Sequence, residues 1–432
     1  MKKLLSLVLT LMMLASIAVV AHADDEPITL VFLNQTNTWT EPMQKMADMY
    51  EEYTNGRVKV VLEGYSFNDL FNMIEVKIGA KPASTEYDIL SIDVPNVASY
   101  GRREMLAPLD EYFTEEDRAN LLPAAIEAGS YNGQFLAAPL CTSAQILYYN
   151  PDLLTAEEIA EIEAATVENR LTWERVAEIA EAAMKRNDPD GTNGIWGLDF
   201  QQVSRVYQMN QLANSMGGKQ VDETGYSLAG VIDTDSWKAA LAWYQGLVEK
   251  GVCSKGVTAD QIGNYFYSGK LVFMIGTTEI PTIAGNNNMP NIAWTPSPVF
   301  AGHEADIATA TGSWHYGVNA ASEHVKEAAE FVHFLTTNPE ATETFYQMKG
   351  NFPAYIPLLD KLGELDTTPG YMKIAFYEAV NTAYPRALTP AFSEYSAIIN
   401  ALWEDVRNGE DIDEVISDSI DEYASQCVKY QQ

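Results

Sequence analysis

Two hydrophobic patterns alternate along the first part of this chain. Runs rich in aliphatic and β-branched residues predict strands at 28–33, 58–62 and 87–92. Between these runs, residues 43–50 and 70–78 repeat apolar side chains at the three- and four-residue spacing of an amphipathic helix. Strands that alternate with helices favour an α/β fold with largely parallel sheets.

The segment 131–154 combines a turn, two strand-like runs and a helix start. Asn132-Gly133 is a strong hairpin signal, and apolar residues follow it as far as Pro139. The pattern restarts at 145–149 and stops at Asn150-Pro151, because the residue before a proline is biased toward an extended conformation. The chain therefore passes from one strand pair directly into a second structural unit.

Beyond residue 151 the pattern becomes helical. Thr155 and Glu158 have the spacing of a capping box, which marks a helix start. Ser322 is placed to cap a helix whose inward face lies within 325–335. Helices and strands thus continue to alternate in the second half of the chain.

The segment from Asp188 to Asp199 resembles a calcium loop in part. The EF-hand spacing requires an oxygen ligand at Thr192, a glycine where Asn193 stands, and glutamate rather than Asp199 at the last position. We expect a turn here, and calcium binding is the open alternative.

The N-terminus has the three parts of a secretory signal: Lys2-Lys3, an apolar run over 4–20, and Ala21-His22-Ala23. We expect cleavage after Ala23. A run of about 17 residues is short for a transmembrane span. No cysteine for a lipid anchor lies near the cleavage site. The sequence therefore predicts a soluble protein, exported to a Gram-negative periplasm.

The composition is strongly acidic, with a formal net charge of −33 over 432 residues. Removing residues 1–23, which carry two lysines and no acid, leaves −35 on 409 residues. Such a surface repels nucleic acid and anionic lipid. This length fits two lobes of roughly 200 residues each.

Cysteine usage indicates neither a disulfide framework nor a metal site. The chain has three cysteines, Cys141, Cys253 and Cys427. Cys253 and Cys427 could pair, and buried free thiols are the alternative. Their spacing matches no zinc or redox motif, so we expect no metal and no cofactor.

The motif order allows a comparison with one family. The chain carries Tyr131, Gly133 and Pro139, then Thr142-Ser143, then the run 147–150. This order resembles the extracellular solute-binding proteins of ABC importers, in the sugar-binding group that includes maltose-binding protein. Members have Tyr-x-Gly-x-x-Tyr-Gly-x-Pro, a small polar cluster and Leu-Tyr-Tyr-Asn. Here Ala137-Ala138 stands where Tyr-Gly is commoner.

Later segments resemble the same family in the same order. Residues 265–275 are similar to its Phe-x-x-Gly-Lys strand signature, and 299–302 to a loop. Residues 312–322 resemble its glycine-led strand, which is followed by a helix that starts at serine. The resemblance covers nearly all of residues 28–425.

The resemblance implies an α/β fold of the type II periplasmic-binding-protein class, with two lobes joined by a hinge. The chain crosses between the lobes three times, and we expect the crossings near 139–142, 291–297 and 350–354. The predicted lobes are N-terminal, 24–139 plus 298–350, and C-terminal, 143–290 plus 355–432.

A sugar site needs flat aromatic rings for the apolar faces of the pyranose and fixed polar groups for its hydroxyls. Loops at strand ends and at the first crossing supply both. The candidate ligand-binding residues are Trp39, Asp93, Thr142, Ser143, Glu279, Trp314 and Arg386. Glu279 stands where the family often has an aromatic contact.

Each candidate also has a structural interpretation. Trp39 and Trp314 could be packing residues, and Asp93 could cap a turn. The hydroxyls of Thr142 and Ser143 could form hydrogen bonds with backbone groups of the hinge. Arg386 could form an ion pair between helices.

We therefore predict a monomeric receptor that captures a sugar or oligosaccharide and delivers it to the membrane permease of an ABC importer. One alternative keeps the fold but binds a polyamine or a peptide. The other is an exported carbohydrate-active enzyme. The chain has no Gly-x-Ser-x-Gly, His-Glu-x-x-His or phosphate-loop motif, although paired carboxylates for glycoside hydrolysis remain open.

Overall fold

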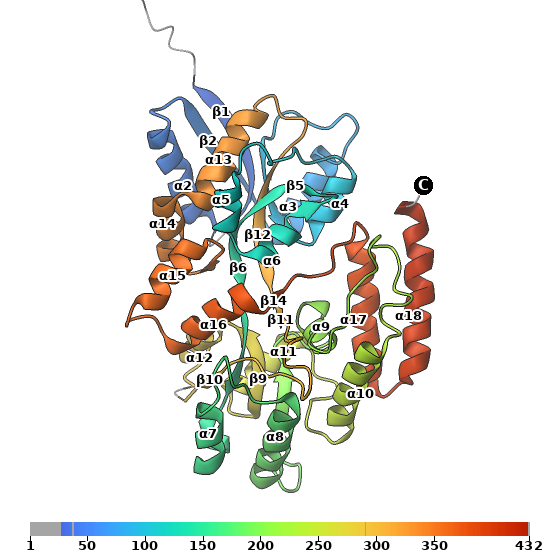
Figure 1. Ribbon diagram of the computed structural model, residues 1–432. Helices are drawn as coiled ribbons and strands as arrows, with labels where there is room; N and C mark the ends of the chain where they lie inside the picture. The colour runs from blue at the N-terminus through green and yellow to red at the C-terminus, as the bar shows by residue number, and fades with distance from the viewer. Residues whose placement is uncertain (1–26, 37–38, 290, 431–432) are drawn as a thin grey trace, which may run out of the picture.

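The computed structural model describes residues 27–36, 39–289 and 291–430, so the predicted signal peptide at 1–23 lies outside the described residues. Two β-sheets lie one above the other, each surrounded by helices (Figure 1). We call each sheet with its helices the six-stranded half and the four-stranded half. No helix within the described ranges is long and apolar enough to cross a membrane.

The six-stranded sheet has the order β13-β6-β12-β3-β1-β2. Its strands are β1 (Ile28–Gln35), β2 (Val58–Tyr65), β3 (Ile89–Asp93), β6 (Ala137–Ser143), β12 (Gly312–Val318) and β13 (Phe352–Pro353). β1 runs parallel to β2 and β3, whereas β12 is antiparallel to β3 and β6. The sheet is mixed rather than largely parallel, because β6 leads out of this half and β12 leads back in.

Helices cover both faces of this sheet. They are α2 (Thr40–Tyr53), α3 (Phe67–Lys77), α4 (Asn96–Arg102), α5 (Glu115–Ala119), α6 (Pro123–Ala128), α13 (Val325–Thr337), α14 (Pro339–Lys349) and α15 (Ile356–Glu364). Successive side chains of β1 point to opposite faces of the sheet, which explains why helices cover both faces. Phe32 belongs to the core cluster under α2 and α13, and Leu33 belongs to the cluster under α3 and α4. Burying each such side chain contributes roughly 1.5–3 kcal/mol.

The second sheet has the order β10-β7-β9-β8. Its strands are β7 (Gln145–Tyr149), β8 (Trp196–Phe200), β9 (Leu271–Thr277) and β10 (Ala293–Thr295). The helices of this half are α7 (Ala156–Glu163), α8 (Trp173–Asn187), α9 (Val206–Asn214), α10 (Asp235–Glu249), α11 (Ala259–Tyr267), α12 (Ile280–Asn286), α16 (Gly370–Asn381), α17 (Phe392–Asn408) and α18 (Ile412–Cys427). Its core is rich in indoles, since Trp173, Trp237 and Trp403 are buried.

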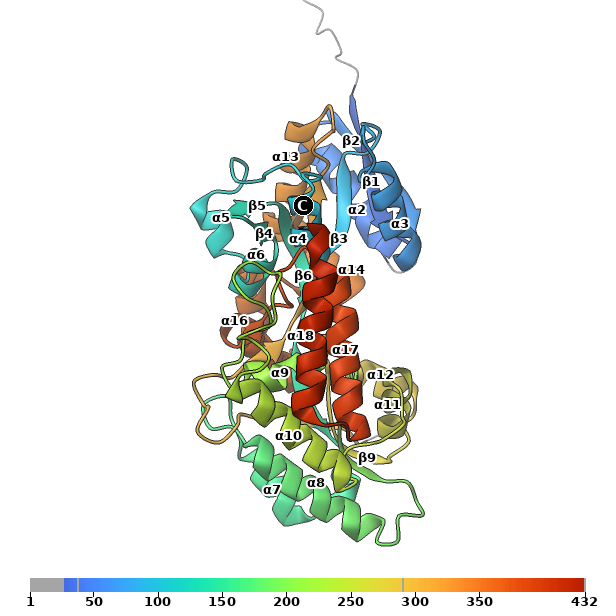
Figure 2. The same cartoon turned by 90° about the vertical axis from the view of Figure 1, so that its right-hand side faces the viewer.

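The C-terminal helices link the two halves along one side of the molecule. α17 and α18 run side by side, and the end of α18 reaches the level of α4 (Figure 2). There Arg102 Nη2 donates a hydrogen bond of 3.2 Å to the carbonyl of Tyr430.

Local signals agree with the structure in several places. Asn132 and Gly133 have φ of 50° and 77° and join β4 (Ser130–Tyr131) to β5 (Gln134–Phe135), which confirms the hairpin. Thr155 and Glu158 form the predicted capping box.

Ser322 is not the N-cap of α13 as predicted. His324 holds that position, and the Ser322 hydroxyl instead accepts a hydrogen bond from the His324 N–H. The Ser322 hydroxyl also bonds Asp88, which fixes the loop before the helix.

The predicted turn forms after Asp188, and strand β8 begins at Trp196. The Asp188 carboxylate accepts hydrogen bonds from the N–H groups of Asn193 and Ile195, at 3.0 and 3.1 Å. No group of three or more His, Cys, Asp or Glu within the described ranges is placed to hold a metal ion. Cys253 and Cys427 are separate buried thiols, and Cys141 is buried too.

Strand β6 of the six-stranded sheet leads directly into strand β7 of the four-stranded sheet. Pro139 lies inside β6, opposite His315, and a register shift between Trp314 and His315 accommodates a residue without an N–H. β6 and β7 are separated only by Ala144.

The return passage lies near β11 (Thr309–Ala310), which pairs with β14 (Ala383–Tyr384). Before it, the N–H of Trp173 donates to the carbonyl of Val299 at 2.8 Å, and the N–H of Ala308 donates to Ser215. Residues 299–308 therefore still pack on the four-stranded half.

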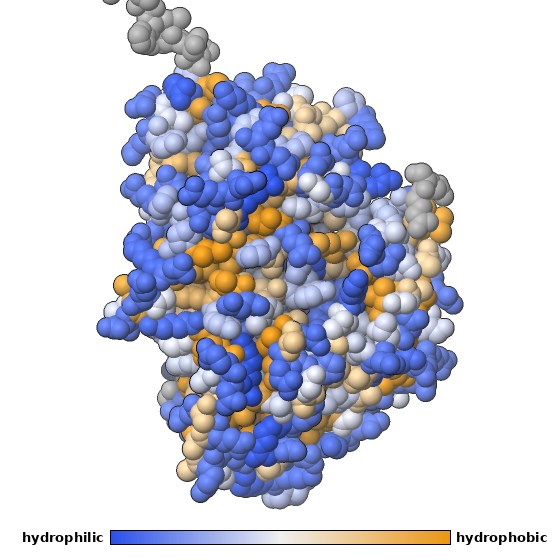
Figure 3. Space-filling view, in the orientation of Figure 1, coloured by the Kyte–Doolittle hydropathy of each residue, from blue (hydrophilic) through white to orange (hydrophobic). Residues whose placement is uncertain are grey.

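Orange side chains gather across the middle of the molecule in Figure 3, while both ends are mostly hydrophilic.

Candidate functional site

A cavity of about 350 Å³ lies between the two halves, and we call it the cleft cavity. Its lining comes from the ends of β3, β6 and β12 on one side, and from β9, α9 and the segment after β14 on the other. The lining residues are Asp93, Cys141, Thr142, Ser143, Gln202, Tyr207, Thr277, Gly312, Trp314, Asn351 and Arg386. Five of the seven candidate residues thus meet at one place.

An ion pair crosses this cavity. Arg386 Nη2 lies 2.7 Å from Asp93 Oδ1, and the two side chains are 17% and 23% exposed. Asp93 ends β3, whereas Arg386 follows β14. The Arg386 guanidinium also lies over the Tyr207 ring, 5.6 Å from its centroid. The Nε atom of Arg386 is buried without a hydrogen-bond partner in the described structure.

Tyr207, at the start of α9, is the centre of a polar network. Its hydroxyl hydrogen-bonds the Ser143 hydroxyl and accepts a bond of 2.8 Å from Gln145 Nε2. Gln208 Nε2 in turn donates to Gln145 Oε1 at 2.7 Å. Burial raises the pKa of Tyr207 despite these bonds, so the phenol stays neutral. A connected buried network of this kind holds its members in fixed positions.

The Thr142 and Ser143 hydroxyls also fasten β6 to β12. Thr142 Oγ1 donates to the carbonyl of Gly312 at 2.8 Å and lies 2.7 Å from Thr311 Oγ1. The N–H of Gly312 donates to Ser143 Oγ at 3.0 Å. A Cβ on Gly312 would come within 3.0 Å of the Tyr207 ring, so glycine permits this close approach. These contacts fit the structural interpretation of both hydroxyls.

Trp314 presents the aromatic surface of the cavity. It is partly buried and lies 5.4 Å from Trp39 and 6.2 Å from Phe71, measured between ring centroids. Trp39 itself is only 6% exposed and packs against Phe345. Trp39 therefore supports Trp314 from behind and does not line the cavity.

Glu279 does not line the cavity either. It is exposed and precedes α12. Its charge nevertheless contributes to the raised pKa of Tyr207 and of Cys141, after the larger effect of burial. The Glu279 carboxylate therefore affects the site through long-range electrostatics and not through direct contact.

Four polar lining residues escaped the sequence prediction: Gln202, Tyr207, Thr277 and Asn351. Thr277 ends β9 and Gln202 follows β8, so the strand-end argument that selected Asp93 could have found both. Tyr207 and Asn351 have no such local signal, because the packing of distant segments brings them to the cavity.

A cavity between two helix-covered α/β sheets, lined from both, defines a class of protein: a receptor that encloses a small solute between two halves. Comparison with known proteins agrees. The family of bacterial extracellular solute-binding proteins matches residues 34–342, and the chain belongs to that family. Membership in a solute-binding family confirms the prediction of a receptor rather than an enzyme.

Two relatives span most of the chain. A probable ABC transporter-binding protein of Deinococcus radiodurans is 25% identical over 403 residues, which are 89% of this chain and 90% of that protein. A maltotriose-binding protein of Pyrococcus abyssi is 23% identical over 385 residues, which are 88% of this chain and 76% of that protein.

Solved structures show the same fold. A cyclo/maltodextrin-binding protein in complex with maltotetraose has a TM-score of 0.77 at 17% identity, covering 95% of this chain and 100% of that one. The maltose-binding periplasmic protein of Listeria monocytogenes has a TM-score of 0.75 at 16% identity, covering 94% and 99%. The predicted type II periplasmic-binding-protein fold is thereby confirmed.

Proposed function

We propose that this protein captures a neutral sugar or oligosaccharide in the cleft cavity and delivers it to the permease of an ABC importer. The observation that carries the proposal is the pairing of an aromatic surface, Trp314, with the fixed polar groups of Arg386, Asp93 and the Tyr207 network. A pyranose needs both, because it has apolar C–H faces and a rim of hydroxyls.

The charges of the cavity favour a neutral ligand. Asp93 is the only carboxylate among the lining residues of the described structure, and Arg386 pairs with it. A polyamine would need carboxylates without a partner, and an anion would have to displace Asp93 from Arg386. The buried Nε of Arg386 and the amides of Gln202 and Asn351 are suited to hydroxyl groups.

Relatives support a malto-oligosaccharide as the first ligand to test. The Pyrococcus abyssi relative is a maltotriose-binding protein, and the two structural neighbours hold maltotetraose and maltose. The Deinococcus radiodurans relative supports an ABC transporter as the partner.

The proposed lobes follow the two halves of the fold. We place the end of the first N-lobe segment at Ala144, where β6 gives way to β7. The return to the N-lobe is placed near Thr309, because 299–308 pack on the four-stranded half. The last crossing is placed after α15, since Lys361 on α15 pairs with Glu343 on α14.

The family is extracellular, and we propose that this protein works as a monomer in the periplasm after cleavage at Ala23. The intact mass of the exported protein checks this point. A mass that begins at Asp24 supports cleavage, and a mass that retains residues 1–23 refutes it.

A thermal-shift screen tests the proposed ligand class. Maltose, longer malto-oligosaccharides, other disaccharides, spermidine and a tripeptide are compared on the purified protein. A ligand at 100 times its Kd stabilises the folded state by about 2.7 kcal/mol. We expect such stabilisation from at least one sugar and none from spermidine or the peptide. Stabilisation by spermidine or the peptide alone would replace the sugar proposal.

A further inference from the structure

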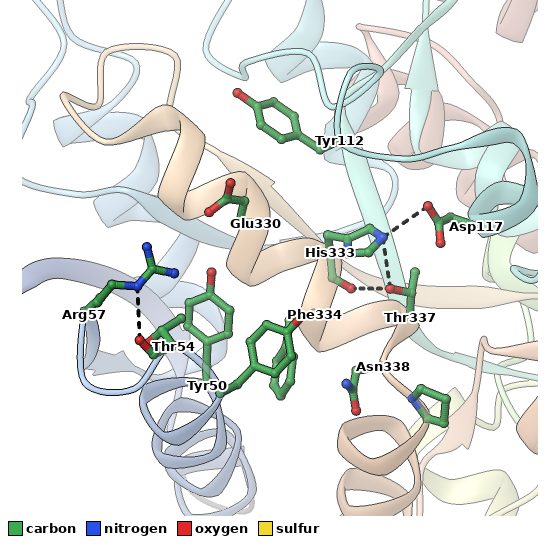
Figure 4. A pocket seen from close by; sticks show the side chains of 12 residues that line it. Tyr50, Thr54, Arg57, Tyr112, Asp117, Glu330, His333, Phe334, Thr337 and Asn338 are labelled. Carbon is green, nitrogen blue, oxygen red and sulfur yellow. Dashed lines mark hydrogen bonds and ion pairs between the residues drawn. The ribbon is translucent and has the colours of Figure 1, made fainter.

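A second cavity, of about 550 Å³, lies among the helices of the six-stranded half and shares no lining residue with the cleft cavity. We call it the helix-face cavity. Its walls come from α2 and the turn after it, α5 and the segment before it, α13, and the start of α14 (Figure 4). Its volume is within the range of about 300–1,000 Å³ that is usual for small-molecule sites.

An exposed aromatic ring forms one wall of this cavity. Tyr53 is 66% exposed, the highest fraction but one among the large hydrophobic residues exposed in the described structure. Its ring is nevertheless held in place, because its centroid lies 5.0 Å from that of Phe334 and 6.1 Å from that of Tyr50. A ring with one packed side and one free side is a preorganised stacking surface.

Polar groups of both signs surround the ring. His333 Nε2 lies 3.2 Å from Asp117 Oδ2 and 3.3 Å from the Thr337 hydroxyl. Burial opposes ionisation of Asp117, but hydrogen bonds from Thr114 and His333 outweigh it and lower the pKa of this carboxyl. Asp117 therefore remains a hydrogen-bond acceptor at neutral pH.

The opposite side of the cavity carries Arg57 and Glu330 (Figure 4). Arg57 Nε donates to the carbonyl of Thr54 at 3.2 Å, which orients the guanidinium, and Arg57 forms no ion pair among the residues described. Within the described part of the chain, the one ion pair of Glu330 is a long contact of 3.8 Å with Lys326. Both side chains therefore keep hydrogen-bonding capacity for a ligand.

We propose that the helix-face cavity is a second binding site for a neutral, polyhydroxylated ring such as a pyranose. The apolar face of the ring stacks on Tyr53, the free guanidinium N–H groups of Arg57 donate to its hydroxyls, and the carboxylates of Asp117 and Glu330 accept from them. Interspersed charges of both signs favour a neutral ligand over an ionic one. One exposed ring gives weak binding, with a Kd of about 1 mM.

Backbone NMR shifts test this site directly. Maltose, cellobiose and xylobiose are each titrated to about 20 mM, well above the expected Kd. We expect the amides of Thr54 and Thr337 to shift with at least one of them. Tyr53→Ala and Arg57→Ala should each weaken the binding at least about fivefold. Tyr377→Ala, which changes an exposed tyrosine on α16, is the control and should leave the affinity unchanged.

Absence of shifts at Thr54 and Thr337 with all three sugars would overturn the inference, as would an unchanged affinity in Tyr53→Ala. The site does not depend on the proposed function, and the two can be told apart in one titration. Shifts at the Trp314 amide report the cleft cavity. Their absence, with shifts at Thr54 retained, would count against the cleft proposal only.

Discussion

Arg386 is the side chain on which the contacts of the cleft converge. It pairs with Asp93, which lies 293 residues earlier in the chain, and it covers the Tyr207 ring. Its Nε–H has no hydrogen-bond partner among the described residues, and burying such a group costs about 1–3 kcal/mol. A hydroxyl or carbonyl of the ligand that accepts a hydrogen bond from this N–H would remove that cost. Because Arg386 also contacts Asp93 and Tyr207, ligand binding at Arg386 involves both halves of the molecule.

His315 gives a pH dependence that can be measured at a single residue. It is fully buried behind the cleft, and burial lowers its pKa to about 4, although Nε2 hydrogen-bonds the carbonyl of Ala125. The unfolded chain binds the proton near pH 6.5, so acidification from pH 6.5 to 4 destabilises the folded state by about 3 kcal/mol through this group.

The variant His315→Gln isolates this effect. We expect the difference in unfolding free energy between the native protein and the variant to fall by about 3 kcal/mol from pH 7 to pH 4. Urea unfolding at several pH values measures it. Burial raises the pKa of Asp199 to about 6, so acidification stabilises the folded state through this carboxyl. Both proteins contain Asp199, so its contribution cancels in the difference between them. A difference that is constant with pH would contradict the assignment.

The residues of the site were only partly predictable from the sequence. Asp93 and Trp314 were found because they lie at strand ends, where side chains of an α/β fold converge. Trp39 also follows a strand, but its indole turned out to be packed behind Trp314. Tyr207 has no local signal, because only the folding of distant segments brings its ring beside Gly312 and its hydroxyl to Ser143.

At the scale of elements, α16 is anchored by a buried ion pair. Arg170 Nη1 lies 2.5 Å from Glu378 Oε1, and the two side chains are 6% and 0% exposed. The Ser297 N–H and the Thr382 hydroxyl also donate to Glu378. This cluster joins α16 to the segments before α8 and after β10.

Glu378→Ala should therefore lower the free energy of unfolding by about 3–5 kcal/mol, because it leaves the Arg170 charge buried without a partner. Glu75→Ala is the matched control: its pair with Arg103 is exposed, and its loss should cost about 0–1 kcal/mol. Chemical denaturation of both variants checks the prediction. Equal, small losses would show that the buried pair contributes little.

Elements with a strong local signal were predicted well. The Asn132-Gly133 hairpin and the capping box of Thr155 and Glu158 depend on a few neighbouring residues, so the sequence is sufficient. The passages between the sheets had no local signal and were placed by the family resemblance alone, and Pro139 would normally end a central strand. Here a register shift opposite β12 absorbs it, and that depends on a strand far along the chain.

At the scale of the whole molecule, the two halves meet at the cleft, where α15 packs against α16, and at the end of the chain, where Tyr430 contacts Arg102. Such an arrangement allows the halves to close on a ligand by rotation. Solution scattering should then give a smaller radius of gyration with a binding sugar than with a sugar that does not bind. Tight binding with no change in the radius would contradict the hinge.

The central claim is that the cleft cavity captures a sugar against Trp314. Calorimetric titration of the best sugar from the screen into three proteins measures this: native, Trp314→Ala and Trp243→Ala. Trp243 is a partly buried indole on α10, which makes it a matched control. We predict one-to-one binding to the native protein, weakened about 5- to 150-fold in Trp314→Ala and unchanged in Trp243→Ala. Native affinity in a folded Trp314→Ala protein would contradict the claim.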